Sequence, residues 1–252
     1  MDFHAAMVFL KGKPRLHPNA IVDAFKANFS QHSISGHGQA EDLSWQFEID
    51  GHPIRIARAN LPFPKAELSG PCDASLLWPT AAKDLKEHKT HFVISFSTEM
   101  DPKVSATILT RFTAAVLESC SDALGVYWGN ACLVIPKNIF VKFAREVLPH
   151  ENPMFIWVDF RVGKTNRGVT FGFTTGLRAF GLREIEAPKA MEELAALRQR
   201  LLDLSDFVLS NGDLFKDGQT IGEDSSITIV AATTKSQFGH QEEVLQLKYS
   251  RI

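Results

Sequence analysis

The sequence predicts an α+β fold made of ferredoxin-like (split βαβ) units, in two packed halves whose mixed, mainly antiparallel sheets are shared or adjacent. Three observations support this class. Segments with the two-residue apolar alternation of strands are interspersed with segments that have helical periodicity. One strong hairpin signal joins two strand-like segments, and the order of predicted elements recurs after residue 98. We therefore expect an N-terminal ferredoxin-like half at 1–98 and a C-terminal α+β half at 99–252.

The first half opens with an apolar run at 6–10 that is typical of a buried strand. A helix over 18–29 follows, because a proline starts it and apolar residues recur every four positions. Next, Asp50-Gly51 separates two alternating runs and predicts a hairpin, since both turn positions need positive φ. A helix over 74–88, interrupted near Pro79, and a strand over 91–97 complete the predicted unit.

The second half repeats this order of elements. Asp101 precedes a proline and can cap a helix whose apolar positions extend to residue 116. The further elements expected are strands at 124–128 and 132–135, a helix over 140–147, and a hairpin of strands at 154–162 and 169–173.

A long helix is expected over Lys189–Leu209, after Pro188 and before the stop signal Asn211-Gly212. Its continuous apolar stripe favours a core position, with a partner surface or a homodimer contact as alternatives. Two late strands are predicted around 227–231 and 244–249.

Composition excludes several classes of protein. The chain has 252 residues, 44% of them hydrophobic, and 27 basic against 29 acidic residues give a net charge of −2. The basic residues are spread out, so a nucleic-acid partner is not expected. The apolar run at the start of the chain is too short for a leader or a membrane span. Three cysteines are an odd number and do not indicate a disulfide framework. We therefore expect a cytoplasmic protein without a membrane partner.

The motif search favours no catalytic residue, no metal and no cofactor. Gly163-Lys164-Thr165 resembles the end of a phosphate-binding loop, but the required glycine five residues earlier is absent, so a hairpin turn is expected. His88 and His91 are interpreted as surface or capping histidines, because no further ligands accompany them. The loop histidines His32 and His37 receive the same interpretation.

The cysteines give a weaker signal. Cys72 follows Gly70-Pro71 and is expected to be the most exposed thiol, whereas Cys120 and Cys132 are expected to be small core residues.

An aromatic hairpin tip is the first candidate contact site. Trp128, followed by Gly129 and Asn130, can pack in the core, line a pocket or anchor an interface. Trp45, Trp128 and Trp157 together define an alternative function, a small-molecule-binding or enzymatic domain with an aromatic-lined pocket.

The run Thr175-Gly176-Leu177-Arg178-Ala179-Phe180-Gly181-Leu182-Arg183-Glu184-Ile185-Glu186 resembles the C-terminal domain of a bacterial family of unknown function. Its signature is Thr-x-Gly-Leu-x-x-Phe-Gly-x-x-Glu-Ile-Glu, and the later stretch 216–222 is also similar. The resemblance is best over about 154–250 and implies no catalytic residue.

The resemblance implies a protein-binding role. Small bacterial families of this kind often act as immunity proteins, which neutralise a toxin by binding it, here a toxin that acts in the cytosol. We expect acidic side chains to face a basic toxin site, and the candidates are Glu184, Glu186, Glu192 and Glu193. A homo-oligomeric structural protein is the third hypothesis.

Overall fold

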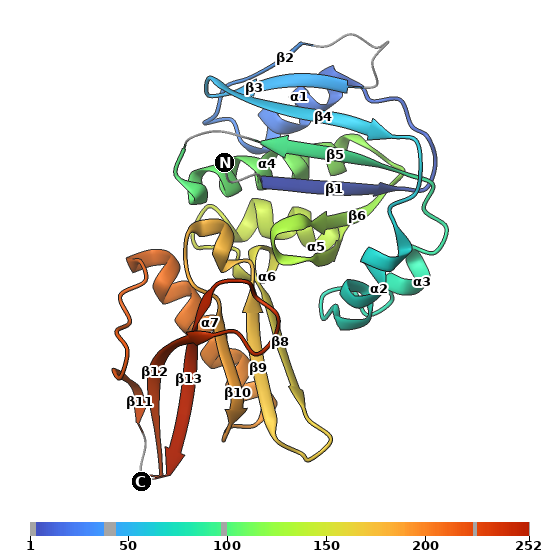
Figure 1. Cartoon of the computed structure of the whole chain (residues 1–252). Helices are drawn as coiled ribbons and strands as arrows, with labels where there is room; N and C mark the ends of the chain where they lie inside the picture. The colour runs from blue at the N-terminus through green and yellow to red at the C-terminus, as the bar shows by residue number, and fades with distance from the viewer. Residues whose placement is uncertain (1–3, 38–43, 97–99, 224–225, 252) are drawn as a thin grey trace. The chain divides into compact units, whose positions relative to one another are not determined.

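The computed structural model describes residues 4–37, 44–96, 100–223 and 226–251. The chain is α+β and divides into two compact units, Met1–Ile156 and Trp157–Ile252, each with its own sheet (Figure 1). The two units are described separately below. Within the described residues, no helix is both long and apolar enough to cross a membrane.

Unit 1 contains a seven-stranded sheet with helices on its faces (Figure 1). Its strands are β1 (His4–Leu10), β2 (Ile34–His37), β3 (Ser44–Ile49), β4 (His52–Ala59), β5 (Thr90–Phe96), β6 (Ala123–Trp128) and β7 (Leu133–Pro136). Its helices are α1 (Pro18–Asn28), α2 (Lys65–Ala74), α3 (Ala81–Asp84), α4 (Pro102–Ser119), α5 (Lys137–Lys142) and, at the end of the unit, α6 (Met154–Trp157).

The strand order in unit 1 is β2-β3-β4-β5-β1-β6-β7, and every neighbouring pair is antiparallel. Strands β5 and β6 are therefore parallel to each other with β1 between them, and α4 connects them. This is a split βαβ connection, but it runs across residue 98, where the sequence suggested a boundary. The expected pair of ferredoxin-like halves, one on each side of that position, is not confirmed.

One face of this sheet is covered by α1 and α4, which pack against each other. Helix α4 begins where the sequence predicts, because the Asp101 carboxylate accepts hydrogen bonds from the backbone N–H groups of Lys103 (2.9 Å) and Val104 (3.1 Å). Its buried side includes Phe112, whose ring centroid lies 5.0 Å from that of Phe47. The Asp50-Gly51 hairpin is also confirmed, with φ of 50° and 82°.

A smaller apolar cluster lies where α2 and α3 meet β1, β6 and β7. It contains Phe9, Phe63, Leu68, Cys72, Trp78, Ala81, Leu85, Tyr127 and Val134. The helix predicted over 74–88, interrupted near Pro79, is wrong in its bounds: α2 starts earlier, directly after Pro64, and ends at Ala74. The break at Pro79 is present, and beyond it only the turn Ala81–Asp84 is helical. The connecting segment is tied down by Trp78, whose Nε1 donates to the Asp84 carboxylate at 2.8 Å.

Unit 2 contains a six-stranded sheet and one long helix. Its strands are β8 (Asp159–Lys164), β9 (Thr170–Thr175), β10 (Ile185–Ala190), β11 (Thr220–Glu223), β12 (Ile227–Lys235) and β13 (Glu243–Arg251), and its helix is α7 (Leu194–Asn211). The order is β11-β12-β13-β10-β9-β8, with β10 and β13 parallel and the other neighbours antiparallel.

Helix α7 packs on one face of this sheet, against β8, β9 and β10 (Figure 1). The approach is close at Gly172, where a Cβ would lie 2.9 Å from Leu197 Cδ2 and 3.0 Å from Leu201 Cδ1. The apolar stripe of α7 is therefore core, as the sequence favoured: Leu197, Leu201 and Val208 are buried. The helix ends before Gly212, which has a φ of 85°.

Two predicted boundaries in this region are wrong. The alternation over 154–162 predicted one strand, but Met154–Trp157 is a helical turn that follows Pro153, and the strand starts at Asp159. Residues 156–158 are all buried, so their apolar character does not distinguish a strand from a helix. Pro188 lies inside β10 rather than at a helix start. The pairing of β10 with β9 is irregular between Ala187 and Ala190, and this irregularity accommodates the missing N–H of Pro188.

Candidate functional site

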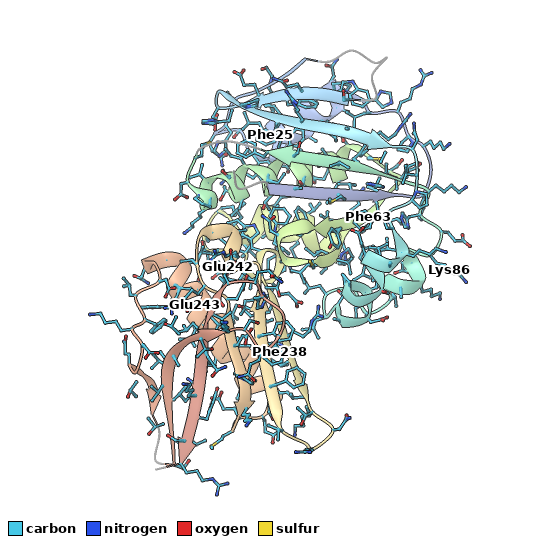
Figure 2. The ribbon with its side chains drawn as sticks, in the orientation of Figure 1. Phe25, Phe63, Lys86, Phe238, Glu242 and Glu243 are labelled. Carbon is cyan, nitrogen blue, oxygen red and sulfur yellow. The ribbon has the colours of Figure 1, made fainter. Side chains whose placement is uncertain are left out.

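The loop between β12 and β13, residues 236–242, crosses the face of the second sheet that α7 leaves uncovered. Gly172 points toward α7, so its neighbours Phe171 and Phe173 point to the opposite face. Phe238 from the loop stacks on both rings, with centroid distances of 5.5 Å to Phe171 and 4.6 Å to Phe173. An aromatic contact thus fastens the loop to the sheet (Figure 2).

A buried carboxylate on the sheet also binds the same loop. Glu186 on β10 has no exposed surface, and it accepts hydrogen bonds from the Ser236 hydroxyl and from the Gln237 backbone N–H, the latter at 2.9 Å. The Ser236 oxygen in turn accepts from the backbone N–H groups of Phe238 and His240, both at 3.0 Å. Glu186 therefore determines the path of the loop through one connected network.

Glu184 does the same for the turn that follows β9. Its carboxylate accepts from Thr174 Oγ1 at 2.7 Å, from the Gly176 N–H at 2.7 Å and from the Arg178 N–H at 3.0 Å. Gly176 has a φ of 123°, a conformation that a residue with a side chain rarely adopts. The expectation that Glu184 and Glu186 face solvent or a partner is wrong, because both carboxylates are buried and bind the protein's own backbone.

The fixed turn and the fixed loop border a hollow of about 670 Å³. Two of its lining residues, Glu242 and Glu243, are labelled in Figure 2. Every side chain that lines it is polar or charged: Arg178, Arg183, Lys235, Ser236, His240, Gln241, Glu242 and Glu243. At its rim, Arg178 Nη2 and Glu242 Oε1 form an ion pair of 2.5 Å, with about half of each side chain exposed. The hollow combines both signs of charge at an accessible surface.

Arg183 is a structural part of this wall. Its guanidinium donates to both oxygens of Asp213 at 2.5 and 2.7 Å, to Thr233 Oγ1 at 2.7 Å and to the Phe215 carbonyl at 2.9 Å. The hydrogen bonds to Asp213 raise the pKa of Arg183. With its donors occupied in this way, Arg183 connects the segment after α7 to β12 and contributes charge rather than free hydrogen-bonding groups.

The other two predicted acids differ from each other. Glu192 is mostly buried and accepts from Arg200 Nε at 2.8 Å and from the Tyr249 hydroxyl at 2.7 Å. Burial, followed by the hydrogen bond to Glu192, raises the pKa of Tyr249. Glu193 is the exposed one, with an ion pair of 3.1 Å to Lys164 outside the hollow.

The predicted hairpin tip is largely internal. Trp128 is 1% exposed and packs against Phe140 with ring centroids 5.9 Å apart, while Asn130 lies in the short helical turn Gly129–Ala131 and is partly buried. Trp45 and Trp157 are also buried. The three tryptophans therefore pack in the core of the described structure.

The histidines of the sequence analysis hold loops together. His88 and His91 are buried rather than exposed: His88 Nε2 accepts from the Phe63 N–H at 2.8 Å, and His91 Nδ1 donates to the Leu61 carbonyl at 3.1 Å. His32 Nδ1 donates to Asp50 Oδ2 at 2.5 Å. The side chain of His37 lies outside the described residues. Among the residues that are described, no group of three or more potential ligands could hold a metal ion.

Two expectations about the cysteines are reversed. Cys72 is buried, and burial raises the pKa of its thiol, which disfavours the reactive thiolate. Cys132 is exposed, with a φ of 51°, whereas Cys120 is buried as expected. The segment Gly163-Lys164-Thr165 leads from the end of β8 into the hairpin turn before β9, as predicted, with Thr165 N donating to the Val169 carbonyl at 2.9 Å.

The residues that sequence reasoning missed are those of the 236–242 loop and Asp213. A sequence signal for the loop exists, because Ser236 and Gly239 are turn-forming residues between two alternating runs. Nothing in the local sequence indicates that Phe238 folds back onto β9, or that Asp213 receives Arg183.

Comparison with known proteins adds one finding. Residues 173–248 match a family described as a domain of unknown function (DUF4261), which confirms the resemblance to a family of this kind. The matched region contains both buried carboxylates and the whole of the 236–242 loop. No curated protein and no solved structure matches the chain.

Proposed function

We propose that unit 2, which contains the DUF4261 match at residues 173–248, is a non-catalytic protein-binding module whose contact surface is the hollow beside the 236–242 loop. The observation that carries this proposal is the use of Glu184 and Glu186. Both carboxylates bind the loops that form the hollow, so they position a surface instead of acting on a substrate.

The character of the hollow favours a protein over a small molecule. Pockets for small organic ligands are mostly apolar with a few polar groups. Here every lining residue carries a polar or charged group, and polar and aliphatic atoms share the lining surface about equally. Ion pairs at an accessible rim contribute mainly to partner selection and to the rate of association. A protein surface with complementary charges of both signs fits such a hollow.

The most specific form of the proposal is an immunity protein that binds and neutralises a toxin acting in the cytosol. The acids that would meet a basic toxin site are then Glu242 and Glu243 rather than Glu184 and Glu186. Glu193 lies outside the hollow and provides a matched comparison.

The test is affinity purification of the tagged full chain from its host, with partner identification by mass spectrometry and stoichiometry by light scattering. Glu242→Lys and Glu193→Lys each replace one partner of an exposed ion pair. We expect Glu242→Lys to weaken partner binding roughly tenfold or more, since like charges placed opposite each other in an interface cost several kcal/mol. Glu193→Lys should bind as the wild type does.

Neutralisation is tested by co-expressing the chain with the partner it captures. If the partner is toxic alone, the wild type should restore growth and Glu242→Lys should not. Equal binding by the two variants would refute the hollow as the contact surface, and self-association as the sole result would favour the homo-oligomer instead.

A further inference from the structure

Unit 1 contains an apolar hollow of a different kind, between α2 and the segment that includes α3. Its volume is about 190 Å³, and it is lined by Lys65, Leu68, Ser69, Cys72, Ala82, Leu85, Lys86 and His88. Lys86 is labelled in Figure 2. This volume is comparable to an apolar protein cavity of about 150 Å³ that stays dry and binds benzene. The hollow can therefore accept a compact apolar group.

The inner wall offers a ligand few polar groups. Leu68, Cys72 and Leu85 are buried apolar residues. Both ring nitrogens of His88 are occupied, since Nδ1 donates to the Leu85 carbonyl at 2.5 Å and Nε2 accepts from the Phe63 N–H. The wall is also held in place, because the His88 ring packs edge-on against Phe9 with centroids 5.3 Å apart.

The rim, in contrast, carries two positive charges. Lys65 in the first turn of α2 and Lys86 after α3 are both exposed, and within the described residues neither ammonium group forms a hydrogen bond or ion pair. Among the residues that the structure describes, no acidic side chain lines the hollow. An apolar interior with cationic groups at its mouth is complementary to a small molecule with an apolar body and an anionic end.

We propose that this hollow binds a small amphipathic anion, with its apolar body against Leu68 and Leu85 and its carboxylate or similar group at Lys65 and Lys86. The site is independent of the surface in unit 2, so either proposal can fail without the other. The bound group has about the bulk of a six-carbon chain or ring, because the hollow is only slightly larger than the benzene-binding cavity.

The probes are hexanoate, hexan-1-ol and hexylammonium, which share one apolar body and differ in charge. Each is titrated into the full chain, and binding is followed by NMR shifts of the lining residues. We expect saturable binding with hexanoate tightest and hexylammonium weakest. Lys65→Gln and Lys86→Gln should each weaken hexanoate by up to roughly fivefold, the range of an exposed charge pair, and leave hexan-1-ol unchanged.

Lys83→Gln is the matched control, because Lys83 is an exposed lysine on α3 that does not line the hollow. Ala82→Phe changes an exposed rim residue, so the fold should tolerate it while the new ring blocks the mouth and abolishes binding. As a second readout, hexanoate should slow alkylation of the Cys72 thiol in a Cys132→Ser background, which removes the exposed thiol.

Three results would overturn the proposal. They are equal affinity for hexanoate and hexan-1-ol, unchanged binding by Ala82→Phe, and alkylation of Cys72 at the same rate with and without hexanoate.

Discussion

In unit 2, individual buried carboxylates hold the loops in place. Glu186 is fully buried, yet it stays within one hydrogen-bonded network with Ser236 and Gln237. A buried charge is tolerated only when such partners replace water. The cost of removing that charge should therefore appear as a loss of folding free energy and of loop order.

Glu186→Gln tests this expectation. The glutamine side chain has nearly the same shape, but it keeps only one acceptor oxygen. The NH₂ group that replaces the other oxygen cannot accept the hydrogen bond that the Gln237 N–H or the Ser236 hydroxyl donates there. We expect the free energy of unfolding to fall by roughly 2–3 kcal/mol, the range for a hydrogen bond to a charged group. Urea denaturation measures it, with Glu193→Gln on the exposed surface as a control that should change stability by less than about 0.5 kcal/mol.

His91 gives a prediction about pH. Burial lowers its pKa, which outweighs the effect of the Leu61 carbonyl that accepts from Nδ1. Between about pH 6.5, where an unfolded histidine gains its proton, and the lower folded pKa, the unfolded chain binds more protons than the folded one. The free energy of unfolding should therefore decrease as pH falls through this window.

Urea denaturation of wild type and His91→Gln between pH 8 and pH 5 isolates the effect of that residue. The wild type should lose more stability than His91→Gln over the window. Parallel curves would show that the folded and unfolded chains protonate His91 equally.

At the scale of elements, the contact between α7 and β9 depends on a missing side chain. At Gly172 a Cβ would also lie 3.0 Å from Val162 Cγ1, so three side chains on two elements leave no room for it. We expect Gly172→Ala to lower the free energy of unfolding by roughly 1–3 kcal/mol, as overpacking does. Thermal denaturation measures the change.

A double-mutant cycle identifies the cause of that loss. Leu201→Val shortens one of the side chains that the new Cβ would meet, so it should cost less in the Gly172→Ala background than in the wild type. Strict additivity would mean that the two residues do not interact.

The start of α4 gives a second prediction at this scale. Asp101→Ala removes the acceptor for the Lys103 and Val104 N–H groups, and we expect a loss of about 1 kcal/mol. Asp101→Ser keeps an acceptor oxygen and should recover most of the stability. Equal losses in the two variants, measured by urea denaturation, would show that the cap bonds do not stabilise α4.

At the scale of the whole molecule, the division into two compact units predicts separate opening. Gly172→Ala should speed hydrogen exchange in β8, β9 and β10 while exchange in β1, β5 and β6 stays at the wild-type rate. Hydrogen exchange with mass spectrometry resolves these segments. A uniform increase over both sheets would show that the chain opens as one cooperative unit.

The elements that the sequence predicts well are those specified by neighbouring residues. The Asp101 cap, the Asp50-Gly51 turn and the stop at Gly212 each depend on a few adjacent backbone groups, and all are found at the predicted positions. The helical stripe of α7 likewise reports one buried face of a single element. In β9 the alternating phenylalanines lie on the partly buried face, while Thr170, Gly172 and Thr174 form the buried one. The class of fold and most of its elements follow from such local interactions.

The candidate site could not be predicted in this way, because each of its features joins segments that are distant in the sequence. From the sequence, Glu184 and Glu186 are predicted to be exposed acids. They are buried because β10 pairs with β9 and β13 and because the 236–242 loop crosses the sheet and covers Glu186. Pro188 is likewise predicted to start a helix, but it lies in a strand whose irregular pairing tolerates a proline. Burial is a property of what lies against a side chain, so the tertiary structure alone decides which charges form the scaffold and which face a partner.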